Sequence, residues 1–235
     1  MEERQWERIG AAAGIAFVVL LVVGTFMVPA PPHIDASTAK ITTYVNDHRN
    51  ALLASQVLGA LSVLSFLWFV GHLRHVLDRA EGGTEALSPI VLVSGATLAA
   101  GGILASMPMT LLAFMAKGPG GLVDGPTVRL VFDLGQITGG LATMLFAPFL
   151  LAMGYAMVRK ELVAEWLGWL SMAVAALDVV AGVGLMTQAT YTAAWNFLGY
   201  AGFLAAGVVI LIASVSMVWH PEAERAAVHT PVFAH

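Results

Sequence analysis

The amino-acid sequence predicts an all-α membrane protein, a six-transmembrane-helix bundle, and its composition and its long apolar runs are the observations that predict it. Of the 235 residues, 58% are hydrophobic and 11% are charged, whereas about 25% of the residues in a soluble domain are charged. Six apolar runs, each near or above the ~20 residues that cross a bilayer, lie at 9–29, 51–73, 89–115, 128–157, 165–187 and 195–218. Short connections favour three antiparallel helical hairpins in one transmembrane domain, residues 1–219, followed by a short tail, residues 220–235.

Local signals justify the first three helices in order. The first run follows "MEERQWER", and we interpret it as a retained helix because it is long and "VPAPPHID" is a poor signal-peptidase site. The prolines of that passage end the helix, and "DASTAKITTYV" offers a helix start within a first connection that we expect to cap the bundle on its outer side. Ser88 and Pro89 predict the N-cap and the first turn of the third helix.

The later helices are bounded just as clearly. "KGPGGLVDGPT" is rich in glycine and proline and predicts an irregular connection before the fourth helix. The fifth run begins at Glu165, and near its middle lies Asp178, which has only alanine, leucine, valine and glycine around it in sequence. The sixth run ends at Trp219, where the polar tail begins. Each run is therefore an expected membrane span.

The distribution of lysine and arginine predicts that both termini face the cytoplasm, since basic residues concentrate on the cytoplasmic side. The expected inner side carries seven such residues, Arg4, Arg8, Arg74, Arg79, Arg159, Lys160 and Arg225, and the outer side carries four, Lys40, Arg49, Lys117 and Arg129. Trp6, Trp166 and Trp219 would form an inner aromatic belt. We expect a multi-pass protein of the cell (plasma) membrane.

Composition also disfavours several function classes. The chain has no cysteine, which excludes disulfides and thiolate metal sites. It also has no basic face that could bind nucleic acid. His72 and His75 form a His-x-x-His pair, but without a further cluster they are better explained as solvated residues at the membrane surface. We therefore expect no metal, no cofactor and no nucleic-acid partner, and we disfavour an enzyme without excluding one.

An internal repeat is a further expectation. The segment "RNALLASQVLGAL" from Arg49 and the segment "RLVFDLGQITGGL" from Arg129 share arginine, glutamine, glycine and leucine at equal spacing, and "NFLGYA" with Asn196 is a fainter copy. Three related hairpins would produce this pattern. A chance match between apolar segments would produce it too, and both explanations stay open.

Polar residues within the spans define a candidate site for a ligand or for an ion or proton pathway. Arg129, Asp133 and Gln136 share one helix face, and Arg49 and Gln56 form the matching stripe. A buried aspartate costs roughly 2.5–3.5 kcal/mol at the centre of a membrane helix, so it should face protein or water. The expected outward-facing cavity is lined by Gln56, Asp133, Gln136, Asp178 and Asn196, with Ser106 and Thr110 at a similar level.

A structural explanation competes with this functional one. Arg129 and Asp133 can pair within their own helix at the membrane surface. Asp178 can hydrogen-bond to a neighbouring helix and so serve helix packing.

The overall pattern resembles a broad group of uncharacterised actinobacterial-type six-helix integral membrane proteins. The resemblance is carried by "WERIGAAAGIAFVVL", by "YVNDHRNALLASQ" and by "EWLGWLSMAVAAL", and it extends over nearly the whole chain. It implies a six-helix fold and a membrane location. It implies no activity and no site residues.

Three functions remain as hypotheses. One is a small-molecule or ion binding or transport protein that uses the polar cavity. Another is an accessory or assembly subunit of a membrane complex, with other membrane-protein subunits as partners beside the lipid bilayer. The least favoured is a membrane-embedded enzyme.

Overall fold

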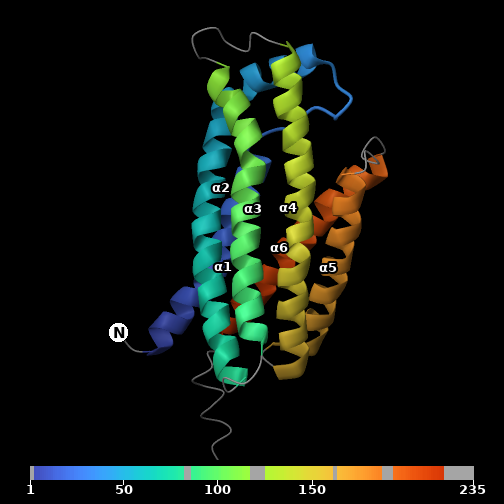
Figure 1. Ribbon diagram of the computed structural model, residues 1–235. Coiled ribbons are helices and arrows are strands. Elements are labelled where there is room, and N and C mark those ends of the chain that lie inside the picture. Colours follow the sequence, from blue (N-terminus) through green and yellow to red (C-terminus); the bar gives the residue numbers. More distant parts are fainter. Residues whose placement is uncertain (1–2, 82–85, 117–124, 161–162, 187–192, 220–235) are drawn as a thin grey trace, which may run out of the picture.

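The computed structural model describes residues 3–81, 86–116, 125–160, 163–186 and 193–219, and every regular element in these ranges is an α-helix (Figure 1). The helices are α1 (Glu3–Phe26), α2 (Thr38–Glu81), α3 (Leu87–Met115), α4 (Gly125–Lys160), α5 (Glu165–Met186) and α6 (Ala193–Trp219). All six are long and apolar enough to cross a membrane, which confirms the predicted class of fold. The predicted tail, residues 220–235, lies outside the described residues. The cytoplasmic position of the termini stays a prediction.

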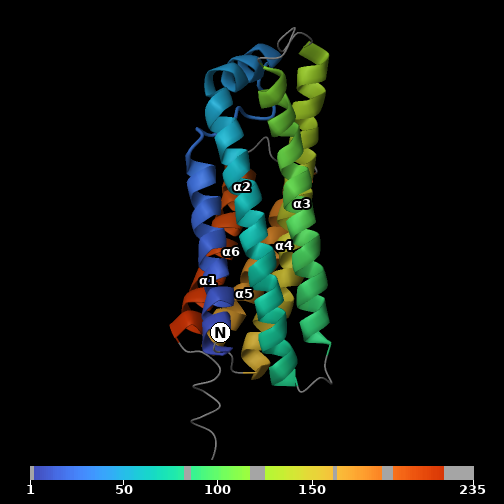
Figure 2. The same ribbon diagram turned by 90° about the vertical axis from the view of Figure 1, so that its left-hand side faces the viewer.

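The helices form a closed ring. Each helix packs against its neighbours in the chain, and α1 packs against α6, while α4 also contacts α2 and α6. Because successive helices run in opposite directions, α1 begins and α6 ends at one end of the bundle (Figure 2). We call this the terminal end, and we call the opposite end, where α2 and α4 begin, the loop end. The loop between α1 and α2, residues 27–37, lies at the loop end and is called the first loop below.

The second helix differs most from the prediction. The helix start expected in "DASTAKITTYV" is present, and from Thr38 one continuous helix of 44 residues, α2, extends through the expected span at 51–73 to Glu81. Its first turns lie across the loop end before the helix runs down the bundle (Figures 1 and 2). Ile41 and Val45, one turn apart, are fully buried there in a cluster with Leu112 of α3 and Phe132 of α4. Burial of this apolar face explains why the segment continues as helix instead of ending near residue 50.

Three helices extend beyond the others at the loop end. A Cβ atom on Gly182 of α5 would lie 3.0 Å from the carbonyl oxygen of Gly140 on α4, so these two residues are level. Gln136, one turn before Gly140, is then level with Met186, where α5 ends. The eleven residues of α4 that precede Gln136 extend ~16 Å beyond α5, at 1.5 Å per residue. Figure 1 shows α2, α3 and α4 reaching past the α5–α6 hairpin. The charged segment around Arg129 therefore lies beyond the end of α5.

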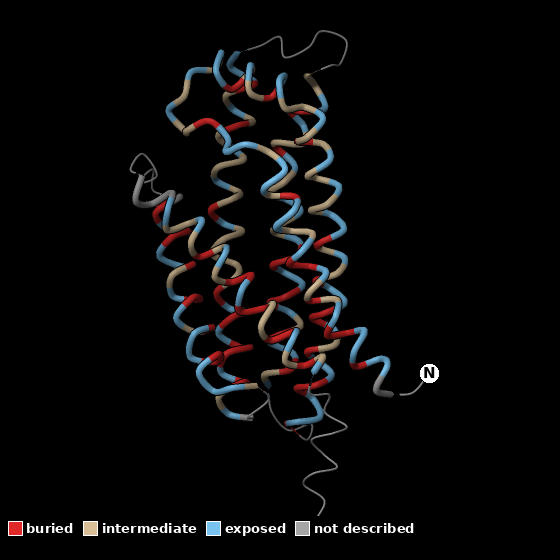
Figure 3. Tube along the Cα trace, turned by 180° about the vertical axis from the view of Figure 1, so that it is seen from behind, coloured by how far each residue is buried: buried red, intermediate tan, exposed pale blue. Residues whose placement is uncertain are grey.

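Buried side chains form two separate cores (Figure 3). The larger core fills the bundle toward the terminal end and includes Phe66 and Phe149, whose ring centroids are 5.2 Å apart in an edge-on arrangement. The smaller core lies at the loop end around Phe132. The smaller core borders one of the two cavities at the loop end that are described below.

The start of α3 differs from the prediction in its cap. Ala86 occupies the N-cap position without a side-chain hydrogen bond, and the predicted cap, Ser88, lies inside the helix. Glu81, at the end of α2, takes this role, because its carboxylate accepts hydrogen bonds from the backbone N–H groups of Leu87 (3.1 Å) and Ser88 (3.3 Å). A carboxylate at a helix N-terminus satisfies free N–H groups and complements the helix dipole. The N-cap of α3 is thus supplied by the preceding helix, and the residues next to the start of α3 could not predict it.

The predicted repeat gains no support. A Cβ on Gly125 would lie 3.7 Å from Cγ2 of Thr38, so the starts of α4 and α2 are neighbours. Arg129 follows the start of its helix by four residues, whereas Arg49 follows the start of its helix by eleven. The two matching sequences therefore occupy different positions along their helices.

The backbones of α4 and α5 approach each other closely at a pair of glycines. A Cβ on Gly154 would lie 2.6 Å from the carbonyl oxygen of Gly168, and a Cβ on Gly168 would lie 2.7 Å from that of Gly154. Nearby, the buried Ser171 hydroxyl donates a 2.8 Å hydrogen bond to the Leu150 carbonyl. Small residues and interhelical hydrogen bonds of this kind hold membrane helices together.

We expect Gly168→Ala to force α4 and α5 apart and to destabilise the protein by about 1–3 kcal/mol. Gly102→Ala is the matched control, because a Cβ at Gly102 meets no atom within 4 Å. Thermal unfolding in a mild detergent measures both variants. Equal midpoints for the two would show that the α4–α5 contact is not close.

Candidate ligand-binding site

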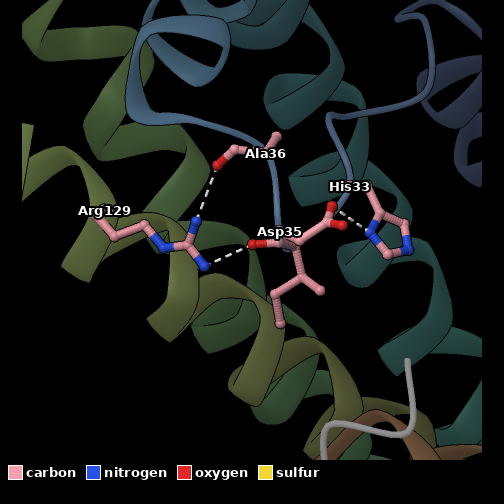
Figure 4. A network of polar contacts seen from close by, with 5 residues as sticks. His33, Asp35, Ala36 and Arg129 are labelled. Carbon is pink, nitrogen blue, oxygen red and sulfur yellow. Dashed lines mark hydrogen bonds and ion pairs between the residues drawn. The ribbon is translucent and has the colours of Figure 1, made fainter. Parts of the chain in front are cut away.

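The guanidinium group of Arg129 fastens the first loop to α4. Its Nε donates a 2.9 Å hydrogen bond to Oδ2 of Asp133, Nη1 donates a 3.0 Å hydrogen bond to the Ala36 carbonyl, and Nη2 donates to the Ile34 carbonyl. Figure 4 shows the side chain pointing at the two loop carbonyls. All three guanidinium nitrogens donate hydrogen bonds. One of them forms the ion pair with Asp133 that the structural explanation predicts.

Three further hydrogen bonds shape the first loop. Nδ1 of His33 lies 2.7 Å from Oδ1 of Asp35 (Figure 4). The Ala36 N–H donates to the His33 carbonyl at 2.9 Å, and the Tyr44 hydroxyl donates to the Pro29 carbonyl at 2.7 Å. The hydrogen bond from His33 lowers the pKa of Asp35 below its ordinary value. A carboxylate with a lowered pKa contributes to stability above its ordinary pKa, and it loses that contribution as the pH falls through the lowered value. The contact with His33 therefore favours the ionised form of Asp35.

A cavity of about 480 Å³ lies under this loop. The end of α1, the first loop, α4 and α6 enclose it, and we call it the α4–α6 cavity. Its walls are mainly glycine, proline, aromatic and threonine residues, namely Thr25, Ala30, Pro31, Pro32, His33, Ile34, Gln136, Gly139, Gly140, Thr143, Gly199, Tyr200 and Phe203. The loop that Arg129 binds is one wall of the cavity, so the position of this wall depends on the hydrogen bonds of Arg129.

A second cavity of about 290 Å³ adjoins the first. The two share Thr25, Ala30, Pro31, Tyr200 and Phe203 as lining residues. The second cavity also reaches Leu52 and Met109 of the smaller core. The two cavities together therefore extend from the smaller core, beneath the first loop, to α4 and α6.

The α4–α6 cavity presents unused polar groups. The Gln136 amide and the Tyr200 hydroxyl make no hydrogen bond within the described ranges. By contrast, Thr25 and Thr143 donate to carbonyls of their own helices, Leu21 at 2.8 Å and Gly139 at 3.0 Å. A polar group in an apolar cavity gains most from a ligand that offers the missing partner. Gln136 and Tyr200 are thus the residues best placed to orient a ligand.

The structure separates the predicted site residues. Gln136 lines the α4–α6 cavity, whereas Asp133 is held by Arg129 and lines neither cavity. Gln56 and Arg49 are half-buried on α2 and also line neither cavity. Asn196 belongs to α6, but its side chain lies outside the described residues.

Two other hydroxyls expected at the level of the site bond within their own helix. Ser106 donates to the Ile103 carbonyl at 2.7 Å, and Thr110 donates to the Ser106 carbonyl at 2.8 Å. Neither lines the α4–α6 cavity.

Asp178 is fully buried between α5 and α6. Neither of its carboxyl oxygens has a hydrogen-bond partner among the residues that the structure describes. Oδ1 lies so close to Gly202 of α6 that a Cβ there would collide with it. Asp178 lines neither of the two cavities at the loop end. The aspartate is accommodated by a glycine on the facing helix, and the expected hydrogen bond to a neighbouring helix is not present in the described part of the chain.

Sequence reasoning missed Tyr200, Thr25 and the loop wall of the cavity. Tyr200 lies within "NFLGYA", which we compared only with the other even-numbered helices. Thr25 and His33 flank the proline cluster, and nothing local shows that the cluster folds back over α4. The available signal was the spacing of Arg129 and Gln136, seven residues apart on one helix face.

Comparison of the chain with protein-family models, with curated proteins and with solved structures finds no match. The cavity and its contacts are therefore the basis for assigning a function.

We expect Arg129→Lys to loosen the first loop, because one ammonium group cannot replace a fork that reaches two carbonyls and a carboxylate. Backbone amide hydrogen exchange in residues 33–36 should accelerate by about tenfold or more. Arg49→Lys is the control, since the one hydrogen bond of Arg49 within the described ranges is a 3.3 Å contact with Asn50. Unchanged exchange in Arg129→Lys would mean that the loop is held by other contacts.

Proposed function

We propose that this protein binds a small amphipathic molecule within the membrane, in the α4–α6 cavity. The observation that carries the proposal is a cavity of about 480 Å³ with a mainly apolar wall and two polar groups, Gln136 and Tyr200, that have no hydrogen-bond partner in the described part of the chain. Small-molecule sites occupy roughly 300–1,000 Å³ and combine apolar walls with a few polar groups. Both the size and the chemistry support a ligand.

The placement of polar groups supports an amphipathic ligand. Gln136 and His33 lie at the loop end of the cavity, and Gln136 is level with the end of α5. Thr143, whose hydroxyl hydrogen is already used, and Phe203 line it further along α4 and α6. A ligand would place its polar group beside Gln136 and Tyr200 and its apolar part toward Phe203. The path into the cavity lies between α4 and α6, which contact each other far less than α4 and α5 do.

Binding is also the first step of transport, and the proposal covers both. The accessory-subunit hypothesis predicts a protein partner instead of a ligand, and no described contact favours it over binding. The membrane-enzyme hypothesis needs a nucleophile and a base together. The His33–Asp35 pair supplies a base at the cavity, but the nearby Thr25 and Thr143 hydroxyls donate to their own helices.

A photoreactive octanol that carries a diazirine tests the proposal, because it is small, amphipathic and marks its own position. With the protein in detergent or nanodiscs, we expect saturable labelling of residues that line the α4–α6 cavity, mapped by peptide mass spectrometry. Unmodified octanol should compete. Labelling spread evenly over lipid-facing residues would overturn the proposal.

Gly139→Leu should abolish this labelling, since Gly139 lines the cavity and a Cβ there meets no atom within 4 Å. The new side chain would fill the cavity without disturbing the packing. Gly102→Leu is the matched control: it is equally unobstructed but lies outside both cavities. Gln136→Leu should weaken binding by about fivefold, the value of one hydrogen bond of ~1 kcal/mol. Equal labelling of both glycine variants would exclude the cavity as the site.

A further inference from the structure

A third cavity, of about 350 Å³, lies at the terminal end between α1 and α2. Its walls include Trp6, Glu7, Trp68, Gly71, His72 and His75. We call it the Trp6 cavity. Figure 1 shows the first turns of α1 leaning away from α2 at this end, and the cavity lies where the two helices begin to separate. It is independent of the α4–α6 cavity, at the other end of the bundle.

Glu7 supplies a buried negative charge to the Trp6 cavity. The residue is 7% exposed, although it lies within the first turns of α1. One carboxylate oxygen lies 3.4 Å from Nη1 of Arg79, which is a long contact for an ion pair. The other, Oε2, has no hydrogen-bond partner within the described ranges. A buried carboxylate oxygen without a partner is costly unless something supplies a donor.

Two indole rings line the same cavity. The ring centroids of Trp6 and Trp68 are 6.4 Å apart, and the ring planes differ by 21°. Both residues are about half exposed, so their faces are accessible from outside the bundle. Aromatic faces attract cations, and tryptophan attracts them most strongly.

We propose that the Trp6 cavity binds an alkylammonium group, namely the amine headgroup of a membrane lipid. The carboxylate of Glu7 would accept a charge-assisted N–H hydrogen bond, and the indole faces of Trp6 and Trp68 would contact the charged carbon–nitrogen end. His72 and His75 can accept a further N–H when neutral, which suits a primary ammonium with its three donors. An anion would meet Glu7 and the negative faces of both rings, so it would be excluded.

A metal ion is a poorer fit. Glu7, His72 and His75 share the cavity, but among the described residues no group of three or more such side chains is arranged to hold a metal. The ligand must therefore bring its own N–H donors.

The position of the cavity favours a lipid over a soluble amine. Trp6, Trp166 and Trp219 are 48%, 57% and 74% exposed, and α1 and α5 begin and α6 ends at this end. Exposed tryptophans of this kind lie at the level of lipid headgroups. A lipid beside α1 and α2 would bring its headgroup to the height of Trp6 without leaving the bilayer.

Native mass spectrometry of the full chain tests this proposal. The protein is released from detergent in the presence of phosphatidylethanolamine or phosphatidylglycerol with identical acyl chains. We expect one phosphatidylethanolamine to be retained, with an affinity about tenfold or more above that of phosphatidylglycerol. Ethylammonium, which carries the ammonium group without the lipid, should compete for the site.

Two variants locate the site. Glu7→Gln removes the charge, and Gly71→Leu fills the cavity, because a Cβ on Gly71 meets no atom within 4 Å. Both should abolish the preference for phosphatidylethanolamine, while Gly102→Leu should retain it. If Glu7→Gln fails to fold, Gly71→Leu still decides the matter, since it leaves the contact with Arg79 intact.

Equal retention of the two lipids by the unaltered protein would overturn the proposal, and so would an undiminished preference in Gly71→Leu. Binding of ethylammonium without any binding of phosphatidylethanolamine would retain the ammonium chemistry and overturn the lipid as its source.

Discussion

The arrangement of the loop end depends on one guanidinium group. Arg129 donates to a carboxylate on its own helix and to two carbonyls of the first loop, so it joins segments that are more than ninety residues apart in the chain. The carbonyls of Ile34 and Ala36 take their donors from this side chain, since arginine supplies several donors in a fixed geometry. The same bonds hold proline and isoleucine residues over α4 as the wall of a cavity. Without the Arg129 hydrogen bonds, the α4–α6 cavity would lose the attachment of its loop wall to α4.

The class of fold was predictable because membrane helices follow from local composition. Five of the six predicted spans correspond closely to α1, α3, α4, α5 and α6, since each needs only a long apolar run. The start of α2 was not predictable in this way. Ile41 and Val45 continue the helix because they pack on α3 and α4, and that contact is invisible in a local sequence. The cap that Glu81 gives to α3 was missed for the same reason.

The candidate site shows the same division. The sequence identified Gln136 and Asp178 as unusual, and the structure explains both, one at a cavity wall and the other against a glycine. Asp133 was also unusual, and the structure pairs it with Arg129 on the part of α4 that extends beyond the end of α5. The residues that complete the cavity, such as Tyr200 and Thr25, are ordinary in sequence, and three separate segments had to fold together before they met.

The unequal lengths of the helices have a consequence for the surrounding bilayer. On the α5–α6 side, the 22 residues of α5 span ~33 Å, close to the ~30 Å thickness of the hydrocarbon core. On the opposite side, the 44 residues of α2 far exceed it. Lipids would thus meet hydrophobic surfaces of different height around one molecule, and such mismatch is relieved by tilting or by local changes in thickness. The protein would therefore take a preferred inclination in the membrane.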